Sequence, residues 1–290
     1  MTVARSARLR LAARRWMRRP ARLRKLGPVP AIPHGPEQAY VLALRQFSRH
    51  VSHAIRQTLG DLSKLTNVPT IRIRIAPPLD AAHRMLRATD AANKQGMNTH
   101  LRPLTGGIDL WPERAVRADA ARVPAVAKGA SPRVQAVLQD RLSKNIQLIK
   151  SIQSEQLNDV QDVLAEHLER GSRVEIIQAA LDERFNISER RAELIARDQV
   201  GKLNGQLAEE RLREVGIRDY IWHTSGGGTP EHGDERVRAG HRVLDGTRQS
   251  YDDPPVVDPK SGRTANPGED FQCRCSAEAD VTGYLDSIGA

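Results

Sequence analysis

The sequence predicts an α+β protein that is mainly helical in its N-terminal and central parts, with a small α+β C-terminal domain of short strands and long loops. Apolar residues recur at spacings of three and four over most of the chain up to Gly216, which is the helical period. Beyond Gly216, short β-rich stretches are separated by Gly, Pro, Asp and Asn. The 290 residues suffice for a buried core and two modest domains.

Four segments are expected along the chain. They are a basic arm with a Pro/Gly linker over 1–36, an N-terminal helical region with a short strand over 37–130, a long helix and helical hairpin over 131–186, and the C-terminal domain over 187–290.

The basic arm holds the whole net charge of +10, because the first 25 residues carry ten Arg or Lys and no acid. Such an arm binds polyanions through counterion release with little sequence preference, although a solvated, disordered tail has the same composition. Deleting residues 1–26 is expected to weaken DNA binding and to leave the fold intact. The candidate nucleic-acid-binding residues are Arg5, Arg8, Arg10, Arg14, Arg15, Arg18, Arg19, Arg22, Arg24 and Lys25.

After the linker, apolar residues recur at helical spacing, which predicts an amphipathic helix over about 36–65. Residues 70–76, TIRIRIA, alternate isoleucine with arginine. This alternation predicts a short strand with its isoleucines on one face and its arginines on the other. Residues 80–130 are rich in Ala, Arg and Pro, and one or two short helices are expected there.

A long helix is expected to begin at Ser131, whose hydroxyl can cap it and which is followed by proline. Its apolar period holds until Gly171, a run of about 35 residues. Two further helices are predicted, one over about 173–184 and one capped by Ser188 and ending at Gly216, where a left-handed residue is expected.

A predicted strand over 220–224 leads into the first of two charged, turn-rich segments. This segment, GDERVRAGHRVLDG, covers 233–246. Asp234 can cap a short helix that brings Arg238 and His241 to about the same side, and the LDG at its end predicts a turn.

The second segment, NPGEDFQCRC, covers 266–275 and contains both cysteines of the chain. Phe271, Cys273 and Cys275 alternate as in a strand, so both sulfurs should lie on one face. A Cys-x-Cys disulfide would be strained, so the thiols are expected to be reduced, as in a cytoplasm.

These sulfurs and the imidazole of His241 supply three of the four ligands that zinc requires. Asp234 or His232 could supply the fourth. The alternative is that Cys273 and Cys275 are small buried hydrophobes, with His241 hydrogen-bonded to a loop carbonyl. The sequence establishes no cofactor, and zinc is the candidate.

Catalytic motifs are weak in this sequence. No second histidine stands one turn from His241, no serine occupies a nucleophile elbow, and SGGGTP lacks the Lys-Ser/Thr of a phosphate-binding loop. An enzyme is not expected, although a metal-dependent hydrolase using His241 and Asp234 stays open, as does a standalone DNA-binding protein. No apolar run approaches the roughly 18 residues that span a bilayer, so no membrane partner is expected.

The order of these motifs, from RAELIARDQ through YIWHT and DERVRAGH to CRC, resembles the Mu F-type head morphogenesis family, the minor head proteins of tailed bacteriophages. The likeness covers about 190–280, so segment 187–290 is interpreted as a Mu F-like domain. Many members carry Cys-x-x-Cys where this chain has Arg238 and His241. This chain therefore lacks the residues of a four-cysteine zinc site, and the candidate that stays open is a variant with His241 and two cysteines. The matching residues are Arg197, Trp222, Thr224, Asp234, Arg236, His241, Gly246, Cys273, Arg274 and Cys275.

Some of the matching residues are expected to serve structure. Trp222 is interpreted as a core residue. Arg197 and Arg236 are expected to form internal ion pairs, with Asp198, Asp234 or Glu235 as partners.

The resemblance implies a virion component that is assembled in the host cytoplasm and lies in the capsid interior near the portal vertex. The implied partners are the phage portal protein and the major capsid or scaffold protein. An arginine-rich arm could also touch packaged double-stranded DNA.

Overall fold

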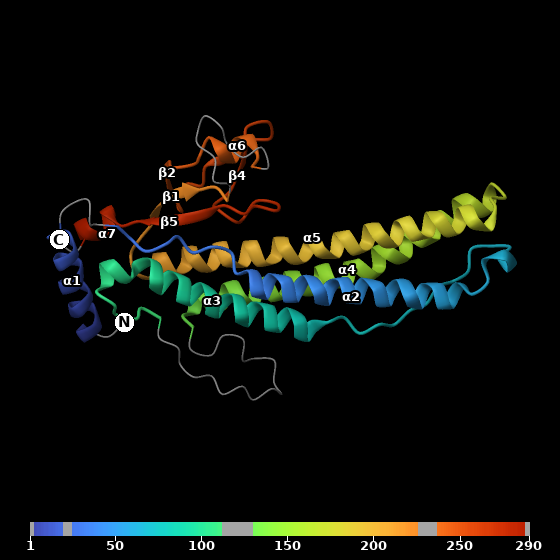
Figure 1. Cartoon of the computed structure of the whole chain (residues 1–290), viewed down its shortest axis with the longest axis horizontal. Helices are drawn as coiled ribbons and strands as arrows, with labels where there is room; N and C mark the ends of the chain where they lie inside the picture. Colours follow the sequence, from blue (N-terminus) through green and yellow to red (C-terminus); the bar gives the residue numbers. More distant parts are fainter. Residues whose placement is uncertain (1–2, 20–24, 112–129, 226–236, 288–290) are drawn as a thin grey trace. The chain divides into compact units, whose positions relative to one another are not determined.

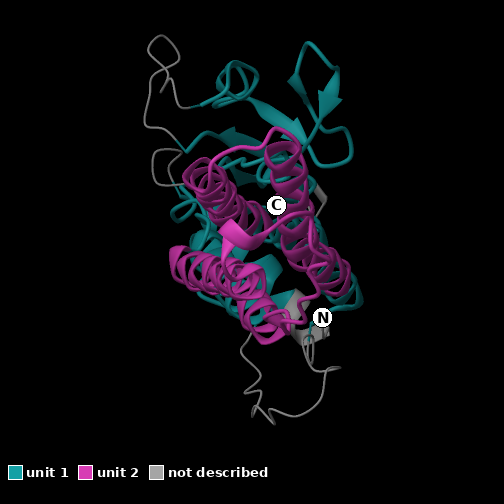
Figure 2. Cartoon of the chain, turned by 90° about the vertical axis from the view of Figure 1, so that its right-hand side faces the viewer, with its two compact units in different colours: residues 1–33, 87–138, 200–290 teal, residues 34–86, 139–199 magenta. Residues whose placement is uncertain are grey.

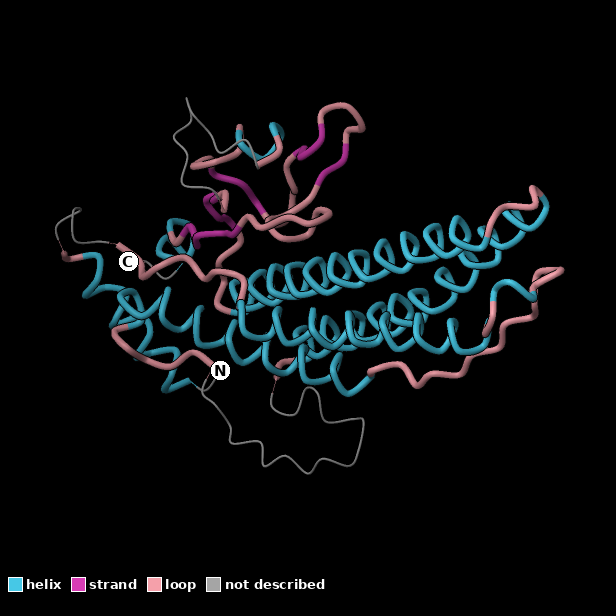
Figure 3. The backbone as a smooth tube through the Cα atoms, turned by 45° about the vertical axis from the view of Figure 1, so that its right-hand side comes forward, coloured by secondary structure: helices cyan, strands magenta, loops and turns pink. Residues whose placement is uncertain are grey.

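The computed structural model describes residues 3–19, 25–111, 130–225 and 237–287 (Figure 1). Long helices make up the N-terminal and central parts, and short antiparallel strands lie in the C-terminal part (Figure 3), which confirms the α+β class. The helices are α1 (Val3–Met17), α2 (His34–Leu59), the 3-10 helix η2 (Leu62–Lys64), α3 (Leu79–Thr105), α4 (Pro132–Glu169), α5 (Val174–Glu214), α6 (Ala239–Arg242) and α7 (Thr282–Ser287). The strands are β1 (Asp219–His223), β2 (Arg248–Ser250), β3 (Val256–Asp258), β4 (Arg263–Thr264) and β5 (Ser276–Asp280).

The chain divides into two compact units, which Figure 2 shows in different colours. Unit 1 comprises residues 1–33, 87–138 and 200–290, and unit 2 comprises residues 34–86 and 139–199. Among the helices of the described ranges, none combines the length and the apolar run that a bilayer crossing needs.

Unit 2 consists of α2 together with parts of α3, α4 and α5. Buried hydrogen bonds join α2 to α4, because Tyr40 Oη donates to Asn145 Oδ1 at 3.0 Å and Gln156 Nε2 donates to Ser52 Oγ at 2.6 Å. Arginines of α2 pair with Glu189 of α5 at the surface. These polar contacts fix the relative positions of three helices around the apolar residues of the unit.

The expected helix over 36–65 is α2, which ends before Gly60, and a short 3-10 turn follows it. Gly60 adopts φ +61°, the left-handed conformation that favours glycine. The strand expected over 70–76 is absent, because these residues form a loop that pairs with no neighbouring strand. The alternation itself is present, because Ile71 is buried while Arg72 and Arg74 are exposed.

The expectation of one or two short helices over 80–130 is wrong for the described part, where α3 is one helix of 27 residues. Polar residues interrupt its apolar pattern, yet several of them are buried. Asp90 pairs with Arg211 of α5, and Asn93 Nδ2 donates to Asn204 Oδ1 at 2.9 Å. Residues 112–129 lie outside the described ranges.

The long helix expected from Ser131 is confirmed as α4, with 38 residues. The Val134 N–H donates to Ser131 Oγ at 3.3 Å, as expected for the cap. Gly171 ends the helix with φ +60°.

The two helices expected after Gly171 are in fact one helix, α5, which runs for 41 residues. Ser188 is therefore buried inside the helix and does not cap it. No Gly or Pro occurs between Val174 and Val200, so the chain has no residue that would break the helix. The expected boundary between residues 186 and 187 falls within α5. The helix ends before Gly216, which adopts the expected left-handed conformation with φ +89°.

Unit 1 contains an antiparallel sheet with the strand order β2-β1-β5, and β3 pairs with β4. The strand expected over 220–224 is β1, and its Trp222 lies opposite Ala277 of β5. Trp222 and Tyr220 are fully buried, which confirms the core position expected for Trp222.

The basic arm begins with a helix rather than a free tail. Leu9, Ala13 and Trp16 of α1 are buried in the same apolar cluster as Met97 and Leu101 of α3. Deleting residues 1–26 would therefore remove part of the core, contrary to the expectation that the fold stays intact. The exposed basic residues of the arm are Arg8, Arg10, Arg14, Arg15, Arg18, Arg19 and Lys25, while Arg22, Arg24 and the side chain of Arg5 lie outside the described part.

Candidate metal centre

The first loop of the candidate site carries His241 on α6, a helix of a single turn. Helix α6 begins at Ala239, and Arg238 occupies its N-cap position. Asp234, which was expected to cap this helix, lies outside the described residues. At the end of the loop, the Gly246 N–H donates to the carbonyl of Trp222 at 2.8 Å, and Gly246 adopts φ +72°. The expected turn is therefore present, and it attaches the loop to β1.

The second loop carries the two cysteines just before β5. The expectation that residues 271–275 form a strand is wrong, because Cys273 N–H donates to the Asp270 carbonyl at 3.1 Å in a turn, and Gln272 adopts φ 51°. Phe271 is 61% exposed, so it does not share a face with the cysteines. The two sulfurs nevertheless lie within 4.8 Å of each other, which agrees with the expectation that they share one side.

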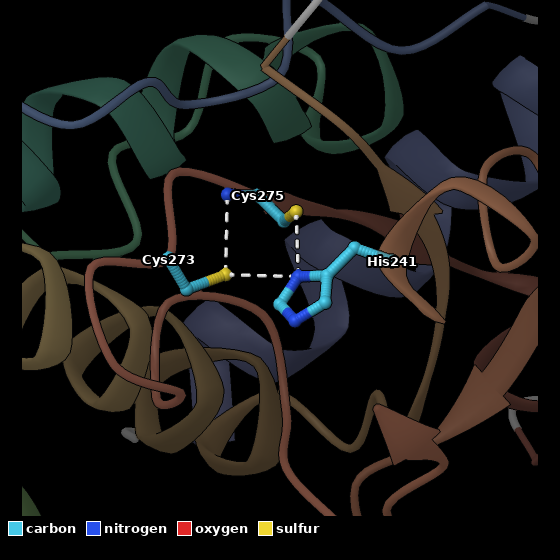
Figure 4. A group of neighbouring side chains, drawn as sticks. All are labelled: His241, Cys273 and Cys275. Atoms are coloured by element: carbon cyan, nitrogen blue, oxygen red, sulfur yellow. Dashed lines mark hydrogen bonds between the residues drawn. The ribbon is translucent and has the colours of Figure 1, made fainter. Parts of the chain in front are cut away.

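The three predicted ligands point toward one another (Figure 4). His241 Nδ1 lies 3.4 Å from Cys275 Sγ and 3.6 Å from Cys273 Sγ. All three ligand atoms lie within 4.8 Å of one another. The side chains are buried, with exposures of 2% for His241, 4% for Cys273 and 6% for Cys275.

Asp270 orients the imidazole from the other side. Its Oδ2 lies 3.0 Å from His241 Nε2 and 3.0 Å from Arg238 Nη1. Its Oδ1 accepts the Phe271 N–H at 2.8 Å and lies 3.1 Å from Arg263 Nε. With Nε2 directed at a carboxylate, Nδ1 is left to face the sulfurs.

Electrostatics favour a charged sulfur at Cys273. The hydrogen bond from the Cys275 thiol, with others from His241 and backbone N–H groups, lowers the pKa of Cys273 to about 5 against the effect of burial. The same contact and burial raise the pKa of Cys275. Burial acts to lower the pKa of His241, but Cys273 and Asp270 raise it overall. In the absence of a metal, these contacts favour negative charge on the Cys273 sulfur and positive charge on the His241 ring.

The donor set also fits a zinc ion. With Zn–S near 2.3 Å and Zn–N near 2.0–2.1 Å, tetrahedral angles place a nitrogen and a sulfur ligand about 3.6 Å apart. The two N···S distances at His241 are 3.4 and 3.6 Å. A zinc-bound histidine commonly directs its other ring nitrogen to a carboxylate, as His241 does to Asp270. Asp234 and His232, the candidates for a fourth ligand, lie outside the described residues.

Glycines of α5 let the cysteine loop lie directly on the helix. A Cβ at Gly205 would stand 2.5 Å from the carbonyl oxygen of Pro267, and one at Gly201 would stand 3.2 Å from that of Cys273. On the other side, the ring of Trp222 meets His241 edge-on at 5.5 Å between centroids.

Arg197 and Arg274 are not among the three ligands. Arg197 belongs to unit 2, where it forms internal ion pairs with Glu193 at 3.4 Å and Glu37 at 3.5 Å, neither of which is among the partners expected from the sequence. Arg274, between the two cysteines, is partly buried. Arg236 lies outside the described residues.

Sequence reasoning missed Asp270 and the two glycines of α5. The signal for Asp270 was its position three residues before Cys273, inside the quoted motif. The signal for Gly201 and Gly205 was their spacing of one helical turn in a predicted helix.

Comparison with known proteins adds to this geometry. Residues 158–278 match the sequence model of the family described as "Phage Mu protein F like protein", which confirms the resemblance of the motifs. A Haemophilus influenzae protein, described as "Uncharacterized protein", is 39% identical over 145 residues. The aligned region is 50% of this chain but 30% of that relative, so the chain covers less than a third of the relative's length. No solved structure matches.

Proposed function

We propose that this chain, whose residues 158–278 match the sequence model of the Mu F-like family, is a minor head protein of a tailed bacteriophage. The observation that carries the proposal is the family match, which includes His241 and both cysteines. On this proposal the protein lies in the capsid interior near the portal vertex and helps to assemble the head.

The Mu F-like region would act as a rigid docking module for the portal protein. Its two loops converge at buried side chains, so the surface around them is held in one arrangement. A metal-dependent hydrolase is less well supported, because a catalytic metal requires an open coordination position that substrate can reach. The burial of His241, Cys273 and Cys275 favours a structural centre.

The docking proposal is tested by co-expressing the chain with the portal protein of the same phage and purifying by a tag on the chain. The portal should be retained by the wild type and reduced with His241→Ala. His223→Ala, a substitution in β1 outside the three ligands, is the matched control and should retain the portal. Loss of the portal from every sample, the wild type included, would contradict the docking role.

We further propose that His241, Cys273 and Cys275 bind zinc, with Asp234 as the fourth ligand. A bound zinc ion would join the two loops and contribute to the free energy of folding. The wild type should then contain about one zinc per chain. Chelation should lower its melting temperature.

Metal quantitation of variants separates this proposal from a metal-free cluster in which His241 and the two cysteines only hydrogen-bond to one another. His241→Ala and Cys275→Ser should lose the zinc, Asp234→Asn should bind it more weakly, and His223→Ala should keep it. A wild-type protein that is purified from zinc-containing medium without metal, and whose melting temperature chelators do not change, would rule out the zinc centre.

The exposed arginines of α1 are proposed to contact packaged DNA. Because Leu9, Ala13 and Trp16 anchor the helix in the core, the test must change the arginines rather than delete the arm. A variant with Arg8, Arg14, Arg15 and Arg18 changed to Gln should bind double-stranded DNA more weakly. In a plot of the logarithm of the binding constant against the logarithm of the salt concentration, the steepness should fall by up to about 3.6. Each of the four arginines would lose one phosphate contact, and each contact contributes about 0.9.

A charge-matched control changes four exposed arginines elsewhere in the chain. They are Arg84, Arg87, Arg170 and Arg184. Equal losses of affinity in the two variants would show that net charge, and not α1, determines binding.

A further inference from the structure

Residues 68–78, which follow the bends after η2 and lead to α3 in unit 2, run as an elongated loop that belongs to no sheet (Figure 3). Pro69 precedes the TIRIRIA stretch, and Pro77 and Pro78 follow it. Proline fixes φ near −65° and restricts the residue before it to extended conformations, so these residues favour the extended form.

One side of this segment is attached to the helices of unit 2. Ile71 is 6% exposed, and Ile73 and Ile75 are partly buried. Gln153 Nε2 of α4 donates to the carbonyl oxygen of Ile73 at 2.9 Å. The isoleucines and this hydrogen bond therefore hold the segment in place.

The other side has the properties of an unpaired strand edge. Within the described residues, no backbone–backbone hydrogen bond involves residues 66–76. In extended chain, the backbone groups of successive residues point to opposite edges. Since the carbonyl of Ile73 points to α4, the backbone groups of Arg72 and Arg74 point to the outer edge.

An outer edge of this kind is a template for strand addition, in which main-chain hydrogen bonds provide affinity and side chains provide specificity. The side chains of Arg72 and Arg74 are exposed on the face opposite the isoleucines, so a strand added at this edge would have alternate side chains beside two positive charges. A carboxylate-bearing strand complements these charges. DNA is the weaker fit, because phosphates accept hydrogen bonds but cannot donate to the carbonyl groups of the edge.

We propose that residues 70–76 bind an extended, acidic segment of a partner protein, which pairs with them as an added strand. The strand that the sequence predicts would then form only in the complex. This proposal rests on unit 2 alone and does not depend on the metal centre or on the identity of the head protein that is bound.

The test uses the full chain and two synthetic seven-residue peptides, one alternating valine with glutamate and one alternating valine with lysine. Fluorescence anisotropy measures affinity, and hydrogen exchange measures protection of the backbone amides. The glutamate peptide should bind more tightly and should slow exchange at Arg72 and Arg74. Changing both arginines to Glu should weaken its binding about tenfold or more and reverse the peptide preference.

Backbone pairing is separated from charge by comparing two variants at one position. Arg72→Gln removes the charge, while Arg72→Pro removes the charge and the N–H, so only the second should lose the amide protection at Arg74. The charge-matched control, Arg84→Glu with Arg87→Glu, should bind the glutamate peptide like the wild type. Equal binding of both peptides, no protection over 70–76, or protection of the same amides by a DNA oligonucleotide alone would overturn the proposal.

Discussion

At Asp270, one carboxylate contacts the imidazole of His241 and the guanidinium groups of Arg238 and Arg263. Burial acts to raise the pKa of Asp270, but the Phe271 N–H and these charged neighbours lower it overall. The carboxylate is therefore ionised at neutral pH, and it is the group that sets the orientation of the imidazole.

Asp270→Asn keeps the shape of the side chain but removes its charge. The free energy of unfolding should fall by about 1.5–3 kcal/mol, the range for hydrogen bonds to charged groups. Zinc affinity should fall about 10–100-fold, as for other changes to groups that orient a metal ligand. Urea unfolding and zinc titration measure the two effects, and Asp286→Asn, at an exposed position, should change neither.

His100 has a different role at the residue scale, because it must stay neutral. Its Nδ1 contacts the Gly27 carbonyl at 2.8 Å, and its Nε2 accepts the Ala279 N–H at 3.1 Å. Burial is the largest influence on the pKa of His100 and lowers it, against the opposing hydrogen bond to Gly27. A proton on Nε2 would break the bond to Ala279.

The unfolded chain therefore takes up a proton on His100 at a higher pH than the folded protein does. The contribution to stability is present above the unfolded pKa, about 6.5, and is lost as the pH falls through the folded pKa. His100→Gln should reduce the loss of unfolding free energy between pH 7.5 and 5.5 relative to the wild type. The control is His50→Gln, at an exposed position, which should leave that loss as in the wild type. If His100→Gln has the same pH dependence as the wild type, the interpretation is contradicted.

The residues of the centre could be predicted only in part. His241, Cys273 and Cys275 were identifiable because few residue types ligate zinc and the cysteines alternate. Asp270 was not, because an acidic residue among turn-forming neighbours is usually solvated, and its contact with His241 depends on how two distant loops fold.

At the scale of elements, α4 was predictable because its apolar residues keep the helical period from Ser131 to Gly171. The length of α3 was not, because Asp90 and Asn93 are buried against α5 and interrupt that period. The split of α5 at Ser188 was wrong for a related reason. A residue typical of helix caps lies inside a helix when tertiary burial overrides local preference.

Gly205 tests how α5 supports the cysteine loop. In Gly205→Ala, the new Cβ would overlap the Pro267 carbonyl, 2.5 Å away, so the loop must shift. The free energy of unfolding should fall by about 1–3 kcal/mol, the range for overpacking, and zinc content should decrease. Gly35→Ala in α2 is the matched control, since nothing lies within 4 Å of its Cβ and alanine favours the helix. A Gly205→Ala protein as stable as the control would show that the loop does not lie against α5.

At the scale of the whole molecule, the order of segments along the chain does not give the compact units. Unit 1 collects three separate stretches, including α1 and the C-terminal sheet, while α3, α4 and α5 each contribute to both units. Periodicity identifies helices, but it does not say which helices share a core. The proposed division at residues 36, 130 and 186 therefore differs from the division that the contacts give.

The central claim is that this chain is a component of a phage head. Quantitative mass spectrometry of purified particles of the phage that encodes it tests this claim most directly. The chain should co-purify with full heads through a density gradient, in smaller molar amount than the major capsid protein and together with the portal. Heads that contain the portal and packaged DNA but lack the chain, although infected cells produce it, would contradict the account.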